Sequence, residues 1–134
     1  MNILRSETLV LLNSEDIVDA RQAVRAWMVA MKFSLVDQTK MVTAASELAR
    51  NTVEYGGGGS MRMEEIENGA IRGLRLVFED RGPGIPDLEL ALKDGYTTGS
   101  GLGLGLSGSK RLVNEFEIWS APGEGTRVTV VKWR

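Results

Sequence analysis

The segment "GSGLGLGLSGSK", from Gly99 to Lys110, contains five glycines and three leucines in twelve residues. Glycine lets backbone amides approach a ligand closely, and a helix that begins in such a loop adds free N–H groups that attract anions. A simple surface linker would carry polar residues where this loop has Leu102, Leu104 and Leu106. The segment therefore predicts a phosphate-binding loop that leads into a helix.

Three familiar phosphate-binding loops fit this segment less well. Gly103, Gly105 and Gly108 match the spacing of the dinucleotide-binding fingerprint, but the preceding "DGYTTGSG" is not the strand that this fingerprint requires. The sequence also lacks the Gly-Lys-Ser/Thr of a Walker loop, and a protein-kinase glycine loop lies near the start of a much longer chain. What remains is a general anion-binding loop made of backbone amides and a helix N-terminus.

Composition limits the class of protein. The chain has 134 residues, of which 43% are hydrophobic and 25% charged, which predicts a single domain over 1–134. A formal net charge of −2 gives no overall support for a nucleic-acid-binding surface. The opening "MNILRSETLVLL" is too short and too charged for a signal peptide or a membrane span, so we expect neither nucleic acid nor membrane as a partner.

The chain contains neither cysteine nor histidine. Their absence excludes thiol catalysis, disulfides, phosphohistidine chemistry within this chain and the commonest ligands of transition metals. Any acid–base catalysis must use carboxylates, lysine or tyrosine. A chain without cysteine fits a reducing cytoplasm, which is the expected location.

Hydrophobic periodicity and turn residues predict the order of helices and strands. The sheet is expected to be mixed but mostly antiparallel, with helices on one face, which makes the fold an α/β two-layer sandwich. Asn68-Gly69 marks a hairpin turn, and "GYTTGSG" resembles a mobile lid. The predicted elements are strands over Thr8–Leu12, Ser60–Ile66, Leu74–Glu79, Phe116–Ser120 and Thr126–Trp133, and helices from Asn13 or Ser14 to about Lys32, from the cap Asp37 to Tyr55, over Leu88–Asp94, and from the glycine loop to Asn114.

The two long helices each have an apolar stripe at helical spacing, which predicts the side that packs on the sheet. Methionine and tryptophan in such stripes are core residues rather than cofactor ligands. The predicted stripes are Ile17, Ala20, Val24, Trp27, Met28 and Met31 in the first helix, and Met41, Ala45, Leu48, Thr52 and Tyr55 in the second.

A second candidate site segment is "EDRGPGIPD", which follows an apolar strand. Asp80 ends that strand, and Gly82 and Gly84 allow the backbone to lie close to a ligand. An aspartate at this position can accept a hydrogen bond from an exocyclic amine. It can equally cap its own turn, and the motif alone does not separate these two interpretations.

A third candidate is "ELARN", in which Glu47 and Asn51 are four residues apart and share a helix face at the edge of the apolar stripe. Their oxygens suit Mg²⁺, and a carboxylate there could act as a general base on a hydroxyl. For the pair alone, an ordinary helix surface is the simpler explanation. Arg50 falls opposite the apolar stripe and is expected to be solvated. The fourth segment, "GEGT" up to Thr126, is by itself a hairpin turn.

The order of these segments is more specific than any one of them. E-x-x-x-N on a helix, D-x-G-x-G after a strand, a lid with G-x-G-x-G, and G-x-G-T before the last strand together resemble the GHKL ATPase superfamily, with its Bergerat ATP-binding fold. The resemblance runs from Asn13 onward. "DGYTTGSGLGLGLSGSKRLVNEF" and "APGEGTRVTVVKW" are most similar to the small RsbT-type switch kinases, relatives of the anti-sigma-factor kinases RsbW and SpoIIAB.

The resemblance implies a role for each matching residue. Asp80 would bind the adenine amino group of ATP, with Gly82, Gly84 and Thr126 around the base. Asn51 would bind the Mg²⁺ that bridges the phosphates, and Glu47 would be the catalytic base that accepts the proton of an attacking serine. The residues implied to surround the phosphates are Gly101, Leu102, Gly103, Leu104, Gly105 and Leu106.

The resemblance also implies partners. An RsbT-type serine kinase would phosphorylate a STAS-domain antagonist in a stressosome-like complex and, once released, activate a PP2C-type phosphatase in a stress response. Two alternatives remain: a non-catalytic nucleotide-dependent binding switch, and an anti-sigma factor kinase that holds a sigma factor directly. Some anti-sigma kinases have a lid arginine that reaches the γ-phosphate, but no basic residue occurs here between Lys93 and Lys110. Either Lys110 or a distant arginine takes that role, or the stabilisation of the transition state is modest.

Overall fold

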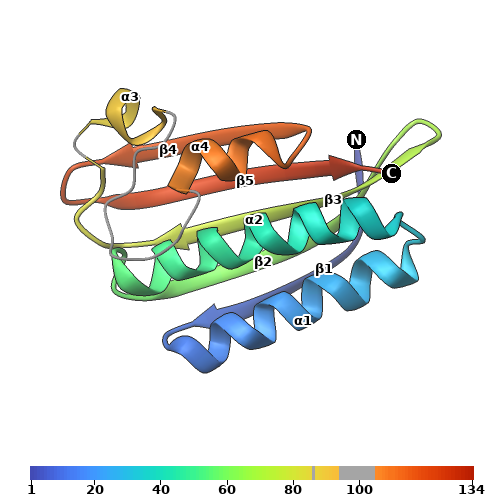
Figure 1. Cartoon of the computed structure of the whole chain (residues 1–134), viewed down its shortest axis with the longest axis horizontal. Helices are drawn as coiled ribbons and strands as arrows, with labels where there is room; N and C mark the ends of the chain where they lie inside the picture. The colour runs from blue at the N-terminus through green and yellow to red at the C-terminus, as the bar shows by residue number, and fades with distance from the viewer. Residues whose placement is uncertain (86, 94–104) are drawn as a thin grey trace.

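The computed structural model describes residues 1–85, 87–93 and 105–134. It has two layers, a β-sheet and a set of helices that cover one face of the sheet (Figure 1). The strands are β1 (Asn2–Leu11), β2 (Gly59–Asn68), β3 (Ile71–Asp80), β4 (Glu115–Ala121) and β5 (Gly125–Trp133), and the helices are α1 (Ser14–Ala30), α2 (Leu35–Glu54), α3 (Leu88–Ala91) and α4 (Gly105–Arg111).

The sheet has the strand order β1-β2-β3-β5-β4. The predicted two-layer α/β class is confirmed, but every described pair of neighbouring strands is antiparallel, so the sheet is not mixed. The reason is that β2–β3 and β4–β5 are hairpins, and β5 rather than β4 lies beside β3. The predicted turn at Asn68-Gly69 is present, with Gly69 at a φ of 65° and Asn68 paired with Ile71.

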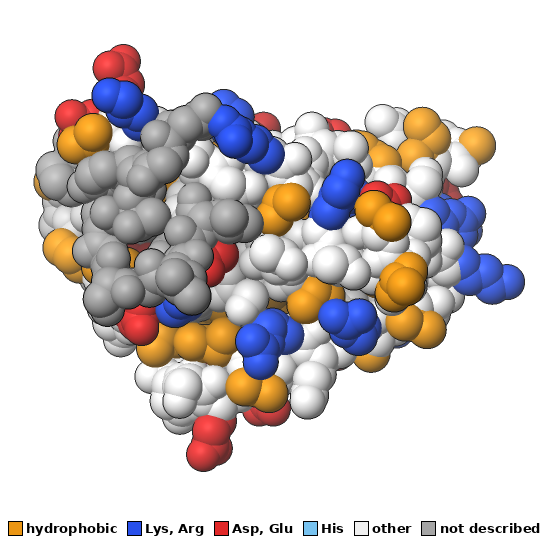
Figure 2. Space-filling model, viewed as in Figure 1, with side chains coloured by type: hydrophobic (Ala, Val, Ile, Leu, Met, Phe, Trp, Pro, Cys, Tyr) orange, Lys and Arg blue, Asp and Glu red, His pale blue; other side chains and the backbone are white. Residues whose placement is uncertain are grey.

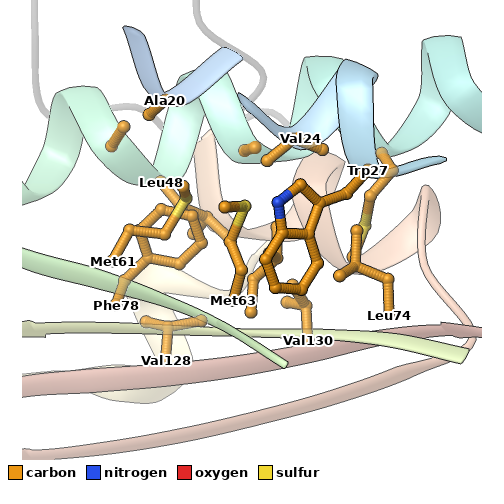
Figure 3. Close-up of a cluster of buried hydrophobic side chains, with 14 of the residues drawn as sticks. Ala20, Val24, Trp27, Leu48, Met61, Met63, Leu74, Phe78, Val128 and Val130 are labelled. Carbon is orange, nitrogen blue, oxygen red and sulfur yellow. The ribbon is translucent and has the colours of Figure 1, made fainter. Parts of the chain in front are cut away.

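The hydrophobic core fills the space between the helices and the sheet. Figure 3 shows side chains of α1, such as Val24 and Trp27, pointing toward strand residues such as Met63 and Phe78. The predicted stripes are buried except at their ends. Ile17 is half-buried, and Tyr55 is 41% exposed because α2 ends at Glu54.

Each long helix begins at a side-chain cap. The Oδ1 atom of Asn13 accepts a hydrogen bond from the Asp16 amide at 3.0 Å, as predicted. The predicted cap of α2 was wrong: Ser34, not Asp37, is the N-cap, and its Oγ accepts from the Asp37 amide at 3.1 Å. The apolar Leu35 and Val36 of the first turn are exposed, so the hydrophobic periodicity starts later than the helix.

The strands extend beyond their predicted bounds, most of all β1, which begins at Asn2 rather than Thr8. Most side chains of β1 are exposed, so its first half carries no clear apolar alternation. Within the described part of the chain, no helix is long and apolar enough to cross a membrane. On the helix-covered face, Lys and Arg side chains form separate groups among hydrophobic and uncharged ones (Figure 2).

Candidate functional site

A row of polar residues crosses the sheet at the end of its helix-covered face. Asp80 on β3 pairs with Thr126 on β5, and Thr126 pairs with Ser120 on β4. Because side chains alternate along a strand, these three point to the same face as the core residues Phe78 and Val128, two positions away along β3 and β5. On this face of the sheet, the apolar core therefore gives way to polar side chains within two residues along β3 and β5.

Glycines surround the Asp80 carboxyl group on two sides. A Cβ atom at Gly56, just past α2, would overlap that carboxyl group, and one at Gly82 would lie 2.7 Å from the backbone of Gly56. Asp80 Oδ1 accepts a hydrogen bond from the Gly82 amide at 2.9 Å. The described residues donate no hydrogen bond to Oδ2. Asp80 Oδ1 therefore caps the turn, and a hydrogen bond from a ligand to Oδ2 remains a prediction.

The loop after Asp80 is held against the β4–β5 hairpin. Gly84 has a φ of 77°, and a Cβ there would overlap the carbonyl oxygen of Ala121. The Gly123 amide donates to the carbonyl of Pro83 at 2.8 Å, and the Ile85 amide donates to Ser120 Oγ at 2.7 Å. The loop backbone is therefore fixed beside the polar row. Pro86 lies outside the described residues.

Ser120 is a site residue that the sequence analysis missed. Its Oγ lies 2.8 Å from Thr126 Oγ1 and 3.0 Å from the Gly125 carbonyl oxygen, in addition to its bond with Ile85. The usable signal was its position: it ends a predicted strand directly before "APGEGT", so a hairpin places it opposite Thr126.

Glu47 and Asn51 lie on α2, one helical turn apart, and both are half-buried. The prediction that Arg50 is simply solvated was wrong. Its Nη2 atom lies 2.6 Å from Glu47 Oε1, since residues three apart on a helix are neighbours. This ion pair engages one carboxylate oxygen of Glu47, and the described residues make no hydrogen bond to the other.

Asn51 connects this helix face to Asp80. Its backbone carbonyl accepts hydrogen bonds from the amides of Tyr55 and Gly56, and Gly56 packs against the Asp80 side chain. The side-chain amide of Asn51 makes no hydrogen bond with other described residues. The end of α2 therefore brings this carboxamide near the polar row.

Only the last part of the glycine-rich loop lies within the described residues. Gly105 begins α4 with a φ of 68°, and Ser109 Oγ donates to its carbonyl at 3.2 Å. Leu106 is buried in the core, which explains one of the leucines in the loop. The other predicted phosphate-binding residues, Gly101, Leu102, Gly103 and Leu104, and the predicted lid lie outside the described residues.

The described residues offer few ligands for a metal ion. The described residues contain no group of three or more His, Cys, Asp or Glu side chains that could hold a metal on their own. A single carboxamide such as Asn51 fits a Mg²⁺ ion that takes most of its ligands from phosphates and water.

Comparison with known families places this chain among ATP-binding proteins. The family model described as "Histidine kinase-, DNA gyrase B-, and HSP90-like ATPase" matches residues 36–134. The match spans most of the chain, so the chain belongs to this family, and the predicted resemblance to the GHKL superfamily is confirmed. Membership implies that the protein binds ATP.

Two curated relatives indicate which kind of ATP-binding protein this chain is. The chain is 46% identical to the serine/threonine-protein kinase RsbT of Bacillus subtilis (strain 168) over 118 residues, which are 88% of this chain and 89% of that protein. It is 29% identical to the anti-sigma F factor of Clostridium kluyveri, over 84% of this chain and 82% of that protein. The predicted serine/threonine kinase of the RsbT type, related to anti-sigma factors, is thereby confirmed.

Solved structures support the fold. The structure of the RsbU and RsbW domains of Rv1364c from Mycobacterium tuberculosis matches with a TM-score of 0.68 and 22% identity, over 97% of this chain and 33% of that one. The mycobacterial sensor histidine kinase MprB matches with a TM-score of 0.57 and 22% identity, over 96% of this chain and 97% of that one. At this identity the two structures show the shared fold alone.

Proposed function

We propose that this kinase uses Mg-ATP to phosphorylate a serine of a STAS-domain antagonist in a stressosome-like complex. Release from that complex would let the kinase bind and activate a PP2C-type phosphatase in the cytoplasm. The observation that carries the proposal is the 46% identity to RsbT over nearly the whole chain. The site geometry is consistent with it, because Glu47 and Asn51 lie in the C-terminal half of α2 and Asp80 contacts Gly56 just beyond its end.

The adenine base is assigned to the polar row. Asp80 Oδ2, to which the described residues donate no hydrogen bond, could accept one from the adenine amino group. The glycines at 82 and 84 let the loop pack directly against the Gly56 backbone and the Ala121 carbonyl oxygen, which holds the loop beside Asp80. Thr126 lies beside Asp80 on the neighbouring strand. The phosphates are assigned to the backbone of residues 101–106, which leads into α4.

Phosphoryl transfer depends mainly on positioning and on neutralisation of charge. Asn51 would hold Mg²⁺ against the phosphates. Glu47 would accept the serine proton as the serine oxygen bonds to the γ-phosphorus, while the bond from that phosphorus to the β–γ bridging oxygen breaks and ADP leaves. Arg50 bonds to Glu47 Oε1, so Oε2 is the oxygen left to accept the proton.

Protein partners need an exposed contact surface. On α1 and α2, the side chains of Val29, Leu35 and Val36 are each more than half exposed. Exposed apolar side chains mark a protein-binding surface only where they form a contiguous patch. These three side chains are therefore candidates for a partner contact.

A second candidate partner is a sigma factor, since relatives with 29% identity are named anti-sigma F factors. Co-purification separates the two: a STAS protein and a phosphatase support the first proposal, and a sigma subunit supports the second. A third possibility, a nucleotide-dependent binding switch without catalysis, is separated by a transfer assay.

The test is transfer of labelled γ-phosphate from Mg-ATP to a candidate STAS protein, with wild type, Glu47→Ala and Glu47→Gln side by side. We expect label on the STAS serine and a loss of about 10²- to 10⁴-fold in rate in both variants, with ATP still bound. Glu47→Gln is the closer control because it keeps the side-chain shape. Full transfer in either variant would remove Glu47 as the base, and no transfer by wild type with the STAS protein still captured would favour the non-catalytic switch.

A further inference from the structure

We infer that Ser120 fixes the Thr126 hydroxyl as a hydrogen-bond acceptor toward a ligand. This makes the base-binding edge, formed by Asp80 and Thr126, selective for a purine with an amino group at C6. The inference rests on the proposed adenine site at Asp80. The observation behind it is the set of three short contacts of one hydroxyl, Ser120 Oγ, with Ile85 N, the Gly125 carbonyl oxygen and Thr126 Oγ1.

Only one arrangement of protons satisfies these three contacts. A hydroxyl has one proton and two lone pairs. The Ile85 amide can only donate, so it occupies one lone pair of Ser120 Oγ at 2.7 Å. The Gly125 carbonyl can only accept, so it takes the Ser120 proton at 3.0 Å.

The third contact then has its direction fixed. Ser120 Oγ and Thr126 Oγ1 are 2.8 Å apart, and two oxygens at that distance need a proton between them. Ser120 uses its proton in the hydrogen bond to the Gly125 carbonyl, so Thr126 must donate to the remaining lone pair of Ser120. The Thr126 hydroxyl is therefore left with lone pairs alone for any other partner.

The same holds for the neighbouring Asp80. Its Oδ1 accepts from the Gly82 amide, and its Oδ2 can only accept while the carboxyl group is ionised. Asp80 and Thr126 are paired across β3 and β5, so the edge offers acceptors on two adjacent strands. Such an edge favours N–H donors and disfavours a carbonyl oxygen.

This edge matters because a carboxylate alone selects weakly between purines. It can accept from the amino group of adenine, but also from the ring N–H of a 6-oxopurine. A freely rotating hydroxyl could then donate to the 6-oxo group and accommodate it. With Thr126 held as an acceptor, the 6-oxo group faces a lone pair instead. We therefore assign to Ser120 a positioning role in base selection rather than direct contact with the nucleotide.

The experiment measures equilibrium dissociation constants for ATP and ITP, which differ at C6, by titration calorimetry of the full chain. The proteins are wild type, Ser120→Ala, Thr126→Val and the double variant. In Ser120→Ala the Thr126 hydroxyl regains its rotation, so we expect the preference for ATP over ITP to fall by about tenfold, a change of about 1.4 kcal/mol. Most of that change should be tighter relative binding of ITP.

The double variant separates base selection from a structural effect. If the gain for ITP comes from the freed hydroxyl, Thr126→Val in the Ser120→Ala background should remove that gain. A purely structural defect would weaken ATP and ITP alike. An unchanged ratio in Ser120→Ala, or a change that persists in the double variant, would overturn the inference.

Asp80→Asn, measured in the same way, separates failure of this inference from failure of the proposed site. Weaker ATP binding in Asp80→Asn with an unchanged ratio in Ser120→Ala would overturn the role of Ser120 alone. Unchanged ATP binding in Asp80→Asn would place the base elsewhere and overturn both.

Discussion

The helix-covered face of the sheet has polar groups at both ends, and the two ends are built differently. At one end, Lys132 on β5 is buried, and its Nζ donates to the Leu112 carbonyl at 3.0 Å and lies 3.6 Å from Asp37. At the other end, one carboxylate oxygen of Asp80 has no hydrogen-bond partner among the described residues. The side-chain amide of Asn51 has none among them either.

The difference indicates which end serves stability and which serves binding. A buried charge is costly unless the fold supplies its partners, and the lysine end supplies them from α2 and from the segment after α4. Polar groups that keep free capacity in a half-buried position need water or a ligand. The lysine end therefore holds α2 and the segment after α4 to the sheet, while the aspartate end is where we propose that the nucleotide binds.

The largest loss of stability is expected from a substitution in the hydrophobic core, which lies between the two polar ends. Phe78 is 2% exposed and contacts the core from β3. Phe78→Ala should lower the free energy of unfolding by about 3–5 kcal/mol, because it removes a large side chain and leaves a cavity. Urea denaturation measures this loss. A loss below about 1 kcal/mol would mean that the core closes around the cavity.

Lys132→Ala should lower the free energy of unfolding by about 2–3 kcal/mol, because it removes a charged hydrogen bond and leaves the Leu112 carbonyl without its donor. Lys132→Met keeps the aliphatic stem and should cost less. Both variants should bind ATP within about twofold of wild type, or about 0.4 kcal/mol. A large loss of ATP affinity in a well-folded Lys132→Met would contradict the division between the two ends.

Asp80→Asn should have the opposite pattern to the Lys132 variants, with a loss of ATP affinity and little change in stability. The dissociation constant for ATP should rise by about tenfold or more, at least about 1.4 kcal/mol, because the amide lacks the negative charge that we propose faces the adenine amino group. The free energy of unfolding should stay within about 0.5 kcal/mol, since an Asn oxygen can still accept from the Gly82 amide. Calorimetry and urea denaturation on the same preparation test both parts, and unchanged ATP affinity would remove Asp80 from the site.

Local patterns in the sequence predicted most of the fold. The hairpin turn at Gly69 and the stripes of α1 and α2 depend on residues close in the chain, so residue spacing alone is enough to predict them. The antiparallel order of the whole sheet could not be predicted in this way, because the place of β5 beside β3 depends on pairing between distant segments.

The site shows the same limit. Asp80 and Glu47 were identified by residue type and spacing, and their roles remain predictions. Ser120 was missed because its importance comes from three contacts that only the folded loop brings together. The pairing of Arg50 with Glu47 depends on which rotamer the arginine adopts, and a helical wheel does not show that.

The smallest predicted effect concerns the start of α2, at the lysine end. Ser34→Ala should lower the free energy of unfolding by about 1 kcal/mol, because the Asp37 amide loses the oxygen that caps it. Ser34→Asn should restore most of that loss, since asparagine is also a good N-cap. ATP affinity should not change in either variant, because this cap lies at the end of α2 away from Asn51. If Ser34→Ala has no effect on urea denaturation, the helix begins nearer Asp37, as its hydrophobic pattern alone would suggest.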